Sequence, residues 1–340
     1  MDKWILKGAR NLVKEDAVEN INSPTQVKVK VTHLLLSNFD AITFDGANSP
    51  NYPVVPGRFA IGIVTDVGEA CYGVERGSRV YLESAKCCGK CISCKSGKPD
   101  LCRDIQIAGR DYNGFMRDFV VCEYTDVAVL PDSVDNLHAL CIETVGLAEN
   151  IYDKLNLSAG QRVAVVGCDF TGNIIAQVLQ YHKVIPVVID SNPKNIEKVK
   201  KCGIAYGFAA DDELHDNVFS ITSGEMCDAA IYSCHAHLPS SLPLKLVGNS
   251  KHVVLAGFSP MDFTFDAKEI IKKDLTVSGV TNGYEYTHAV INMLVHGAID
   301  IEPFEKDIIK DYNPVAMLTE RCENLSTSNR GRMTVIKMIL

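Results

Sequence analysis

The stretch RVAVVGCDFTG, residues 162–172, joins an uninterrupted apolar run to a short turn that ends at Gly172. Such a run is typical of a strand covered on both faces, and the residues that follow it have helical spacing. The alternation of strand and helix continues downstream, which predicts a parallel α/β sheet. The further segments are the helical NIIAQVLQYHK (173–183) and NPKNIEKVKKCG (192–203), and the strands VIPVVID (184–190), CDAAIYSC (227–234), HVVLAGF (252–258) and DLTVSGV (274–280).

The turn after this first strand has the features of a nucleotide-binding loop. Gly172 opens the next helix, and a helix N-terminus can receive a pyrophosphate. Asp190 ends the next strand, where its carboxylate can accept hydrogen bonds from a ribose diol and would repel a 2′-phosphate. The alternative role for Asp190 is a helix-capping carboxylate. The sequence therefore predicts NAD(H) rather than NADP(H), held by Gly167, Phe170, Thr171, Gly172, Asp190, Lys194 and Gly257.

One residue of this loop departs from the glycine-rich pattern. Asp169 stands where a second glycine would allow the backbone to approach the pyrophosphate closely. A carboxylate near a pyrophosphate is unfavourable because the two negative charges repel each other. Two outcomes stay open: the side chain turns away and the diphosphate is slightly displaced, or the affinity for the nucleotide is reduced.

The first 140 residues have a different pattern, in which short β-like runs alternate with Gly, Pro and Asn turns. This pattern predicts a β-rich, barrel-like domain. The runs are TQVKVKVTHLLL (25–36), AIGIVTDVG (60–68), SRVYLES (78–84) and RDFVVCEYTDVAVL (117–130).

A dense cysteine cluster lies within this β-rich half. The stretch CCGKCISCKSGKPDLC, residues 87–102, holds five of the thirteen cysteines of the chain. An odd total fits poorly with a disulfide framework, and in a reducing cytosol such a cluster favours metal binding. Four thiolates can close a tetrahedron around one zinc and leave no open position for water or substrate. The sequence thus predicts one structural zinc per chain, bound by Cys88, Cys91, Cys94 and Cys102 in C-x2-C-x2-C-x7-C spacing.

Length and charge narrow the class of protein. With 340 residues and 46% hydrophobic content, the chain can form two domains. A net charge of −8 and a pI near 5.6 leave no basic footprint for nucleic acid or an acidic membrane. The N-terminus lacks the pattern of a signal peptide, and no long uncharged apolar run is present, so a cytoplasmic protein is expected.

A four-cysteine zinc lobe in a β-rich domain, followed by a Rossmann unit, resembles the zinc-containing medium-chain alcohol and polyol dehydrogenases over essentially the whole chain. The resemblance implies a GroES-like catalytic domain (1–147 and 285–340), a Rossmann nucleotide-binding domain (148–284) and a homodimer or homotetramer. The stretches GFMRDFVV (114–121) and LSTSN (325–329) look closest to the pentitol-phosphate branch, whose members reduce ribulose 5-phosphate to ribitol 5-phosphate.

The chain departs from this family at the catalytic zinc. In the family a cysteine, a histidine with an adjoining glutamate, and a later cysteine or glutamate usually bind that metal. Ser37 stands at the first of these positions, and Arg58 and Phe59 stand at the next two. Glu143 alone still resembles a ligand, and because one good donor is too few for zinc, we expect no catalytic zinc. The hydroxyl that relays protons in the family is also replaced, by Phe39.

Arg58 instead brings a permanent positive charge to the place of the metal. Because an unpaired buried guanidinium is costly, we expect it to pair with Glu143, with Asp40 as a second candidate. Two interpretations stay open: an ion pair that only fills a vacated site, or an arginine that polarises a carbonyl or binds a carboxylate or phosphate. The candidate catalytic residues are Arg58, Glu143, Ser37 and Asp40.

The predicted function is hydride transfer between a nicotinamide nucleotide and a small polar carbonyl or alcohol, such as a polyol or its phosphate, without a catalytic metal. Two alternatives remain. One is a binding protein derived from such an enzyme that has lost its chemistry. The other is a metal-free reductase of an activated double bond, in which an arginine stabilises the developing enolate charge.

Overall fold

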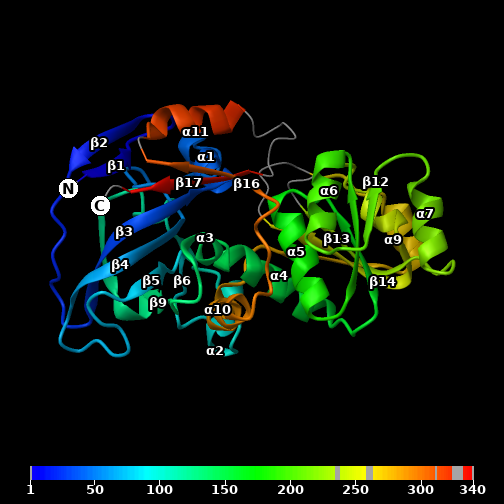
Figure 1. The fold of residues 1–340 in the computed structure, drawn as a ribbon, viewed down its shortest axis with the longest axis horizontal. Helices are drawn as coiled ribbons and strands as arrows, with labels where there is room; N and C mark the ends of the chain where they lie inside the picture. Colours follow the sequence, from blue (N-terminus) through cyan, green and yellow to red (C-terminus); the bar gives the residue numbers. More distant parts are fainter. Residues whose placement is uncertain (1, 234–237, 258–262, 311, 324–331, 339–340) are drawn as a thin grey trace.

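The computed structural model describes residues 2–233, 238–257, 263–310, 312–323 and 332–338. Two large sheets lie at opposite ends of its long axis, with helices α4 and α5 between them (Figure 1). The predicted order, a β-rich part followed by a parallel α/β part, is confirmed. The stretch LSTSN (325–329) lies outside the described residues.

The second part of the chain forms a six-stranded sheet in the order β12-β11-β10-β13-β14-β15, and all its neighbouring strands are parallel. The apolar run Val163–Val166 is fully buried in β10, as expected for a central strand with helices on both faces. The strands are β10 (Arg162–Val166), β11 (Ile185–Asp190), β12 (Tyr206–Ala209), β13 (Cys227–Ser233), β14 (Val247–Ala256) and β15 (Thr276–Val280).

The first part forms a mainly antiparallel seven-stranded sheet in the order β16-β17-β3-β4-β5-β9, with β8 also paired to β3. Strands β16 and β17 come from the C-terminal end of the chain, and β17 pairs with β3 (Figure 1). The strands are β3 (Gln26–Leu36), β4 (Phe59–Val67), β5 (Arg79–Leu82), β8 (Phe119–Glu123), β9 (Val127–Val129), β16 (Glu305–Ile309) and β17 (Arg332–Lys337).

Two small hairpin-like sheets and a set of helices complete the structure. The small sheets pair β1 (Asp2–Leu6) with β2 (Leu12–Asp16) and β6 (Ala85–Lys86) with β7 (Gln106–Ile107). The helices are α1 (Asn38–Asp45), α2 (Ile92–Lys95), α3 (Asn136–Ala139), α4 (Ile142–Leu155), α5 (Phe170–Tyr181), α6 (Pro193–Lys201), α7 (Leu214–Ile221), α8 (Leu242–Lys245), α9 (Ala267–Lys273), α10 (Thr287–Val295) and α11 (Pro314–Glu323), with 3-10 turns η1 (Pro99–Leu101), η2 (Tyr124–Asp126) and η3 (Tyr284–Tyr286).

One apolar core runs through both parts. It joins Leu35 and Ile61 of the antiparallel sheet to Val163 of the parallel sheet, through Val145 of α4 and Ile174 of α5. Helix α4 also packs directly against α5. Burial of these apolar side chains stabilises both parts together. The loops at the junction of the two sheets are therefore supported by one continuous core.

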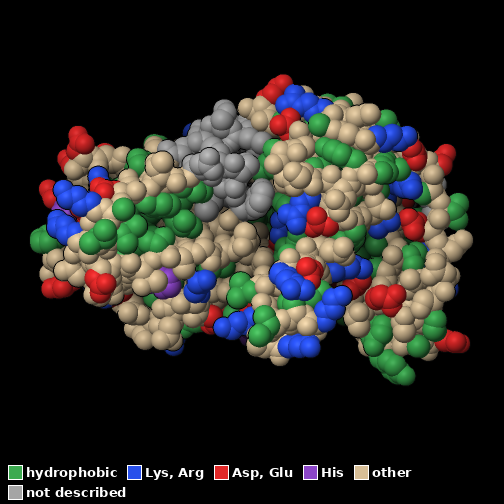
Figure 2. All heavy atoms as spheres, turned by 180° about the vertical axis from the view of Figure 1, so that it is seen from behind, with side chains coloured by type: hydrophobic (Ala, Val, Ile, Leu, Met, Phe, Trp, Pro, Cys, Tyr) green, Lys and Arg blue, Asp and Glu red, His purple; other side chains and the backbone are tan. Residues whose placement is uncertain are grey.

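On the surface drawn in Figure 2, Lys and Arg side chains are interspersed with Asp and Glu side chains over the described part of that face. None of the helices in the described ranges combines the length and apolar character that a membrane span requires. The absence of a nucleic-acid or membrane partner stays a prediction.

Candidate active site and zinc lobe

A cleft of about 130 Å³ opens between the two sheets. From the antiparallel side and α4 it is lined by three predicted catalytic residues, and from the parallel side by the loop after β10. The cleft thus brings together parts of both predicted sites, namely Ser37, Arg58, Glu143, Asp169, Phe170, Thr171 and Gly257.

Arg58 and Glu143 form a buried ion pair at the base of this cleft. Their exposed fractions are 8% and 7%. Arg58 Nε donates to Glu143 Oε2 at 3.3 Å and Nη2 donates to Oε1, while the Ser84 hydroxyl also donates to Oε2. Burial lowers the pKa of Arg58, but the charge and hydrogen bonds of Glu143, together with the nearby Tyr284 and Tyr81, outweigh burial, so the net pKa is raised and the guanidinium stays charged. The predicted pairing of these two residues is present in the structure.

Aromatic rings surround the guanidinium of Arg58. Its central carbon lies 4.6 Å from the ring centre of Phe39, 5.2 Å from that of Phe59 and 5.9 Å from that of Tyr284. Nη2 also donates to the Tyr284 hydroxyl at 2.7 Å. Among the described residues, Nη1 has no hydrogen-bond acceptor, so Arg58 keeps donors for a bound molecule.

A close glycine contact brings Tyr284 to this pair. A Cβ added to Gly283 would lie 1.9 Å from the carbonyl oxygen of Gly146, which is on α4 one turn after Glu143. Neither backbone could approach the other so closely with a side chain in between. The two glycines therefore fix the distance between η3 and α4.

Asp40 caps helix α1 instead of forming an ion pair with Arg58, which corrects the expectation of such a pair. It is 1% exposed and does not line the cleft. Its Oδ2 accepts hydrogen bonds from the backbone N–H (2.8 Å) and hydroxyl (2.6 Å) of Ser37, and its Oδ1 accepts one from Gly57 N–H at 3.1 Å. Ser37 and Asp40 form a capping box at the start of α1 through Oδ2, and the bond from Gly57 occupies Oδ1, so both carboxylate oxygens are used.

The loop after β10 has the tight geometry of a nucleotide-binding turn. Gly167 has φ of +89°, which favours glycine, and a Cβ at Gly172 would lie 1.8 Å from the Gly167 carbonyl oxygen. Helix α5 begins at Phe170, not at Gly172 as expected, because Asp169 acts as its N-cap. Asp169 Oδ1 accepts a hydrogen bond from Gly172 N–H at 3.2 Å, so the carboxylate faces the N–H groups that a diphosphate would use.

Asp190 lies at the end of β11, and its carboxylate already accepts hydrogen bonds from neighbouring residues. Its Oδ2 accepts from Cys168 N–H at 2.8 Å and from the Asn195 amide at 3.3 Å, and its Oδ1 accepts from Asn192 N–H at 2.7 Å. It is 8% exposed, whereas Lys194 on the first turn of α6 is exposed. The carboxylate therefore ties the loop after β10 to the start of α6, which is closer to the alternative structural role, and neither residue lines the cleft.

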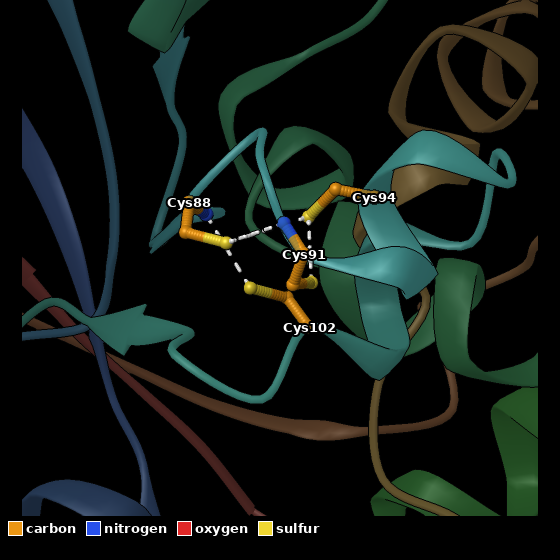
Figure 3. A group of neighbouring side chains, drawn as sticks. All are labelled: Cys88, Cys91, Cys94 and Cys102. Carbon is orange, nitrogen blue, oxygen red and sulfur yellow. Dashed lines mark hydrogen bonds between the residues drawn. The ribbon is translucent and has the colours of Figure 1, made fainter.

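The four predicted zinc ligands lie together in a lobe of short elements around α2 and η1 (Figure 3). The sulfur atoms of Cys88, Cys91, Cys94 and Cys102 all lie within 4.8 Å of one another. Backbone N–H groups of Cys88 and Cys91 point at sulfur atoms at 3.3 and 3.4 Å, which favours thiolates. This donor set fits one tetrahedral zinc, and among the described residues it is the one group of metal-type donors found. The residues around Arg58 do not fit a second zinc, because a guanidinium occupies the centre of the site.

The family "Alcohol dehydrogenase GroES-like domain" matches residues 23–132, and "Zinc-binding dehydrogenase" matches residues 171–296. A sorbitol dehydrogenase of Halalkalibacterium halodurans is 27% identical over 77% of this chain and 79% of its own. An L-threonine 3-dehydrogenase of Sinorhizobium fredii is 29% identical over 83% of this chain and 81% of its own.

The chain belongs to the zinc-type alcohol and polyol dehydrogenase family. A solved structure with the same fold is that of a short chain alcohol dehydrogenase (rspB) from Escherichia coli CFT073 complexed with NADH. It is 22% identical, covers 99% of both chains and has a TM-score of 0.85. The predicted GroES-like and Rossmann folds are thereby confirmed, whereas the pentitol-phosphate branch stays a prediction.

Three residues of this dehydrogenase site were not identified from the sequence: Ser84, Tyr284 and Arg321. Each contributes a polar group to the cleft or to the Arg58–Glu143 pair from a distant segment. No spacing links them in the sequence, because Tyr284 lies 226 residues from Arg58. The capping box of Ser37 and Asp40, by contrast, carries a local signal, since S-x-x-D is typical of a helix start.

The position of Asp169 in this dehydrogenase gives a testable consequence. Asp169→Asn is expected to tighten NADH binding by about tenfold, because asparagine caps a helix nearly as well as aspartate but carries no charge to repel the diphosphate. Fluorescence titration with NADH measures the change. Asp211→Asn, an exposed carboxylate that likewise accepts a backbone N–H, is the matched control and should leave the affinity unchanged. Equal affinity of Asp169→Asn and the parent protein would show that the carboxylate stays clear of the diphosphate.

Proposed function

We propose that this chain is a nicotinamide-dependent oxidoreductase that moves hydride to or from a small polar carbonyl or alcohol, such as a polyol or its phosphate, without a catalytic zinc. The observation that carries the proposal is the position of Arg58, which lines the same cleft as the loop after β10. The relatives named above support the class of reaction, since they are dehydrogenases of alcohols.

Each group has a defined role in this proposal. The nucleotide, held at Gly167, Phe170, Thr171 and Gly172 and at Gly257 directly after β14, supplies or accepts the hydride. Arg58 donates a hydrogen bond from Nη1 to the reacting oxygen and stabilises the negative charge that develops there during reduction. Glu143 holds the guanidinium in place through its bidentate pair. Arg58 cannot readily give up a proton near neutral pH, so the product oxygen takes its proton from water.

The remaining assignments are part of the same proposal. The zinc of the four-cysteine lobe is structural, at one per chain. The catalytic domain comprises 1–147 and 285–340 and the nucleotide-binding domain 148–284, which agrees with the pairing of β17 to β3 and with the last parallel strand ending at Val280. A cytoplasmic homodimer or homotetramer is expected from the family resemblance.

NADH is expected to bind more tightly than NADPH. A 2′-phosphate would meet the negative charge of Asp190 at the end of β11, and the residues that follow it, Ser191 and Asn192, offer no positive charge. Because Asp190 is bound by three N–H groups and is buried, we expect a preference of about tenfold, smaller than an exposed carboxylate would give. Parallel titrations with both nucleotides measure it, and tighter NADPH binding would contradict the assignment.

Turnover tests the proposed function itself. NADH oxidation is followed with the zinc-loaded protein and a panel of simple ketones, ketoses, ketose phosphates and enones. We expect hydride transfer to a carbonyl. Transfer to enones alone would favour the double-bond reductase, and NADH binding with no transfer to any class would favour the binding protein that has lost its chemistry.

A further inference from the structure

A second arginine, Arg321 on α11, lines the same cleft as Arg58. Its Nε donates to Asn38 Oδ1 at 3.2 Å, and its Nη1 donates to the Thr334 hydroxyl at 3.3 Å. Both partners are neutral. They fix the plane of the guanidinium, and Nη2 has no acceptor among the described residues.

The charge of Arg321 is not neutralised by a direct partner. Arg58 forms its ion pair with Glu143, whereas no carboxylate in the described ranges lies within ion-pair distance of Arg321. Asp40 is close enough to raise the pKa of Arg321, but its oxygen atoms accept hydrogen bonds from Ser37 and Gly57. Burial acts more strongly in the opposite direction, so the pKa of Arg321 is lowered. A partly buried cation of this kind is stabilised by an anion that enters the cleft.

The charges around the cleft favour an anion on the α11 side. Arg58 and Glu143 cancel each other, and Asp169 lies across the cleft on the loop after β10. Arg321 is therefore the cationic donor that faces a substrate without a competing carboxylate bonded to it. A planar guanidinium with free N–H groups matches the oxygen atoms of a carboxylate or a phosphate.

We propose that Arg321 binds an anionic group of the substrate, a carboxylate or a phosphate ester, while the carbonyl or alcohol of the same molecule lies against Arg58. This inference rests on the proposed function and narrows its substrate class to hydroxy acids or polyol phosphates and their carbonyl forms. Asn38 and Thr334 act as positioning residues that orient the guanidinium.

Anion binding tests this proposal without any need for turnover. Inorganic phosphate and acetate are titrated by calorimetry into the zinc-loaded protein, with and without saturating NADH. We expect one of the two anions to bind the parent protein, and Arg321→Gln to weaken that binding by about tenfold or more. Tighter phosphate binding assigns a phosphate ester, and tighter acetate binding assigns a carboxylate. Arg103→Gln removes an exposed arginine of the zinc lobe and is the matched control, with unchanged binding.

Two binding results would overturn the proposal: no binding of either anion to the parent protein, or equal affinity of the anion for Arg321→Gln and the parent protein. Arg321→Lys keeps the charge but loses the planar guanidinium, so it should bind the anion with intermediate affinity. This second variant tests the proposal if Arg321→Gln does not fold. The NADH titration and the turnover panel test the proposed function, so its failure can be distinguished from failure of the anion-binding role of Arg321. An active enzyme that prefers neutral ketones to ketose phosphates and keto acids would contradict the role of Arg321 alone.

Discussion

Arg58→Ala is expected to lower kcat by about 100-fold or more while the affinity for NADH stays the same. Removal of one preorganised donor to a developing oxyanion typically costs 10²–10³ in rate. The nucleotide loop is not touched by the change, since Arg58 lies directly before β4, on the antiparallel side of the cleft. Steady-state kinetics on the best substrate of the panel, together with an NADH titration, give both numbers.

The double variant Arg58→Ala/Glu143→Ala separates a catalytic from a structural role. Arg58→Ala leaves a buried carboxylate unpaired, which costs roughly 3–5 kcal/mol in the free energy of unfolding. Removing Glu143 as well should recover much of that loss, since the two residues are in direct contact. If Arg58 acts on the substrate, the recovered protein stays inactive. Activity that returns together with stability would show that the ion pair only fills the site.

Cys94→Ser is expected to release the zinc and to lower Tm by roughly 5–10 °C. The lobe around the four cysteines consists of short elements with few buried apolar residues of their own, so binding of the metal supplies much of its stability. Zinc analysis and a thermal melt of the same sample measure both effects. Chelation of the parent protein should produce the same shift.

Cys87→Ser is the matched control for this change. Cys87 lies next to the cluster in sequence but is exposed, and its thiol contacts the Pro99 carbonyl oxygen at 3.2 Å instead of the other sulfur atoms. Its loss should leave zinc content and Tm unchanged. Zinc loss without a shift in Tm in Cys94→Ser would contradict the structural role of the metal.

The features that could be predicted from the sequence are those marked by a local pattern of residues. The spacing of Cys88 to Cys102 places four thiols within reach of one ion, and the apolar run ending at Val166 places the nucleotide loop at a strand end. The pairing of Arg58 with Glu143 was also predictable, because the family resemblance places these two oppositely charged residues close together and a buried guanidinium needs a partner.

Contacts between distant segments were not predictable in the same way. Tyr284 reaches Arg58 only because Gly146 and Gly283 allow two backbones to touch, and Arg321 reaches the cleft only because α11 and β17 return to the first sheet. Asp40 was expected only as a second candidate partner of Arg58, and its contacts with Ser37 and Gly57 instead occupy both carboxylate oxygens. Hydrogen bonds of this kind are decided by the tertiary packing and not by spacing along the chain.

The proposed hydride transfer, in which Arg58 takes the place of a catalytic metal, determines how many zinc ions an active chain holds. The most direct test is the zinc content per chain, by elemental analysis, of the same sample that oxidises NADH in the presence of its carbonyl substrate. We expect about one zinc per chain, held by the four cysteines, in a fully active sample. Two tightly held zinc ions per active chain, with activity lost when the second is removed, would contradict it.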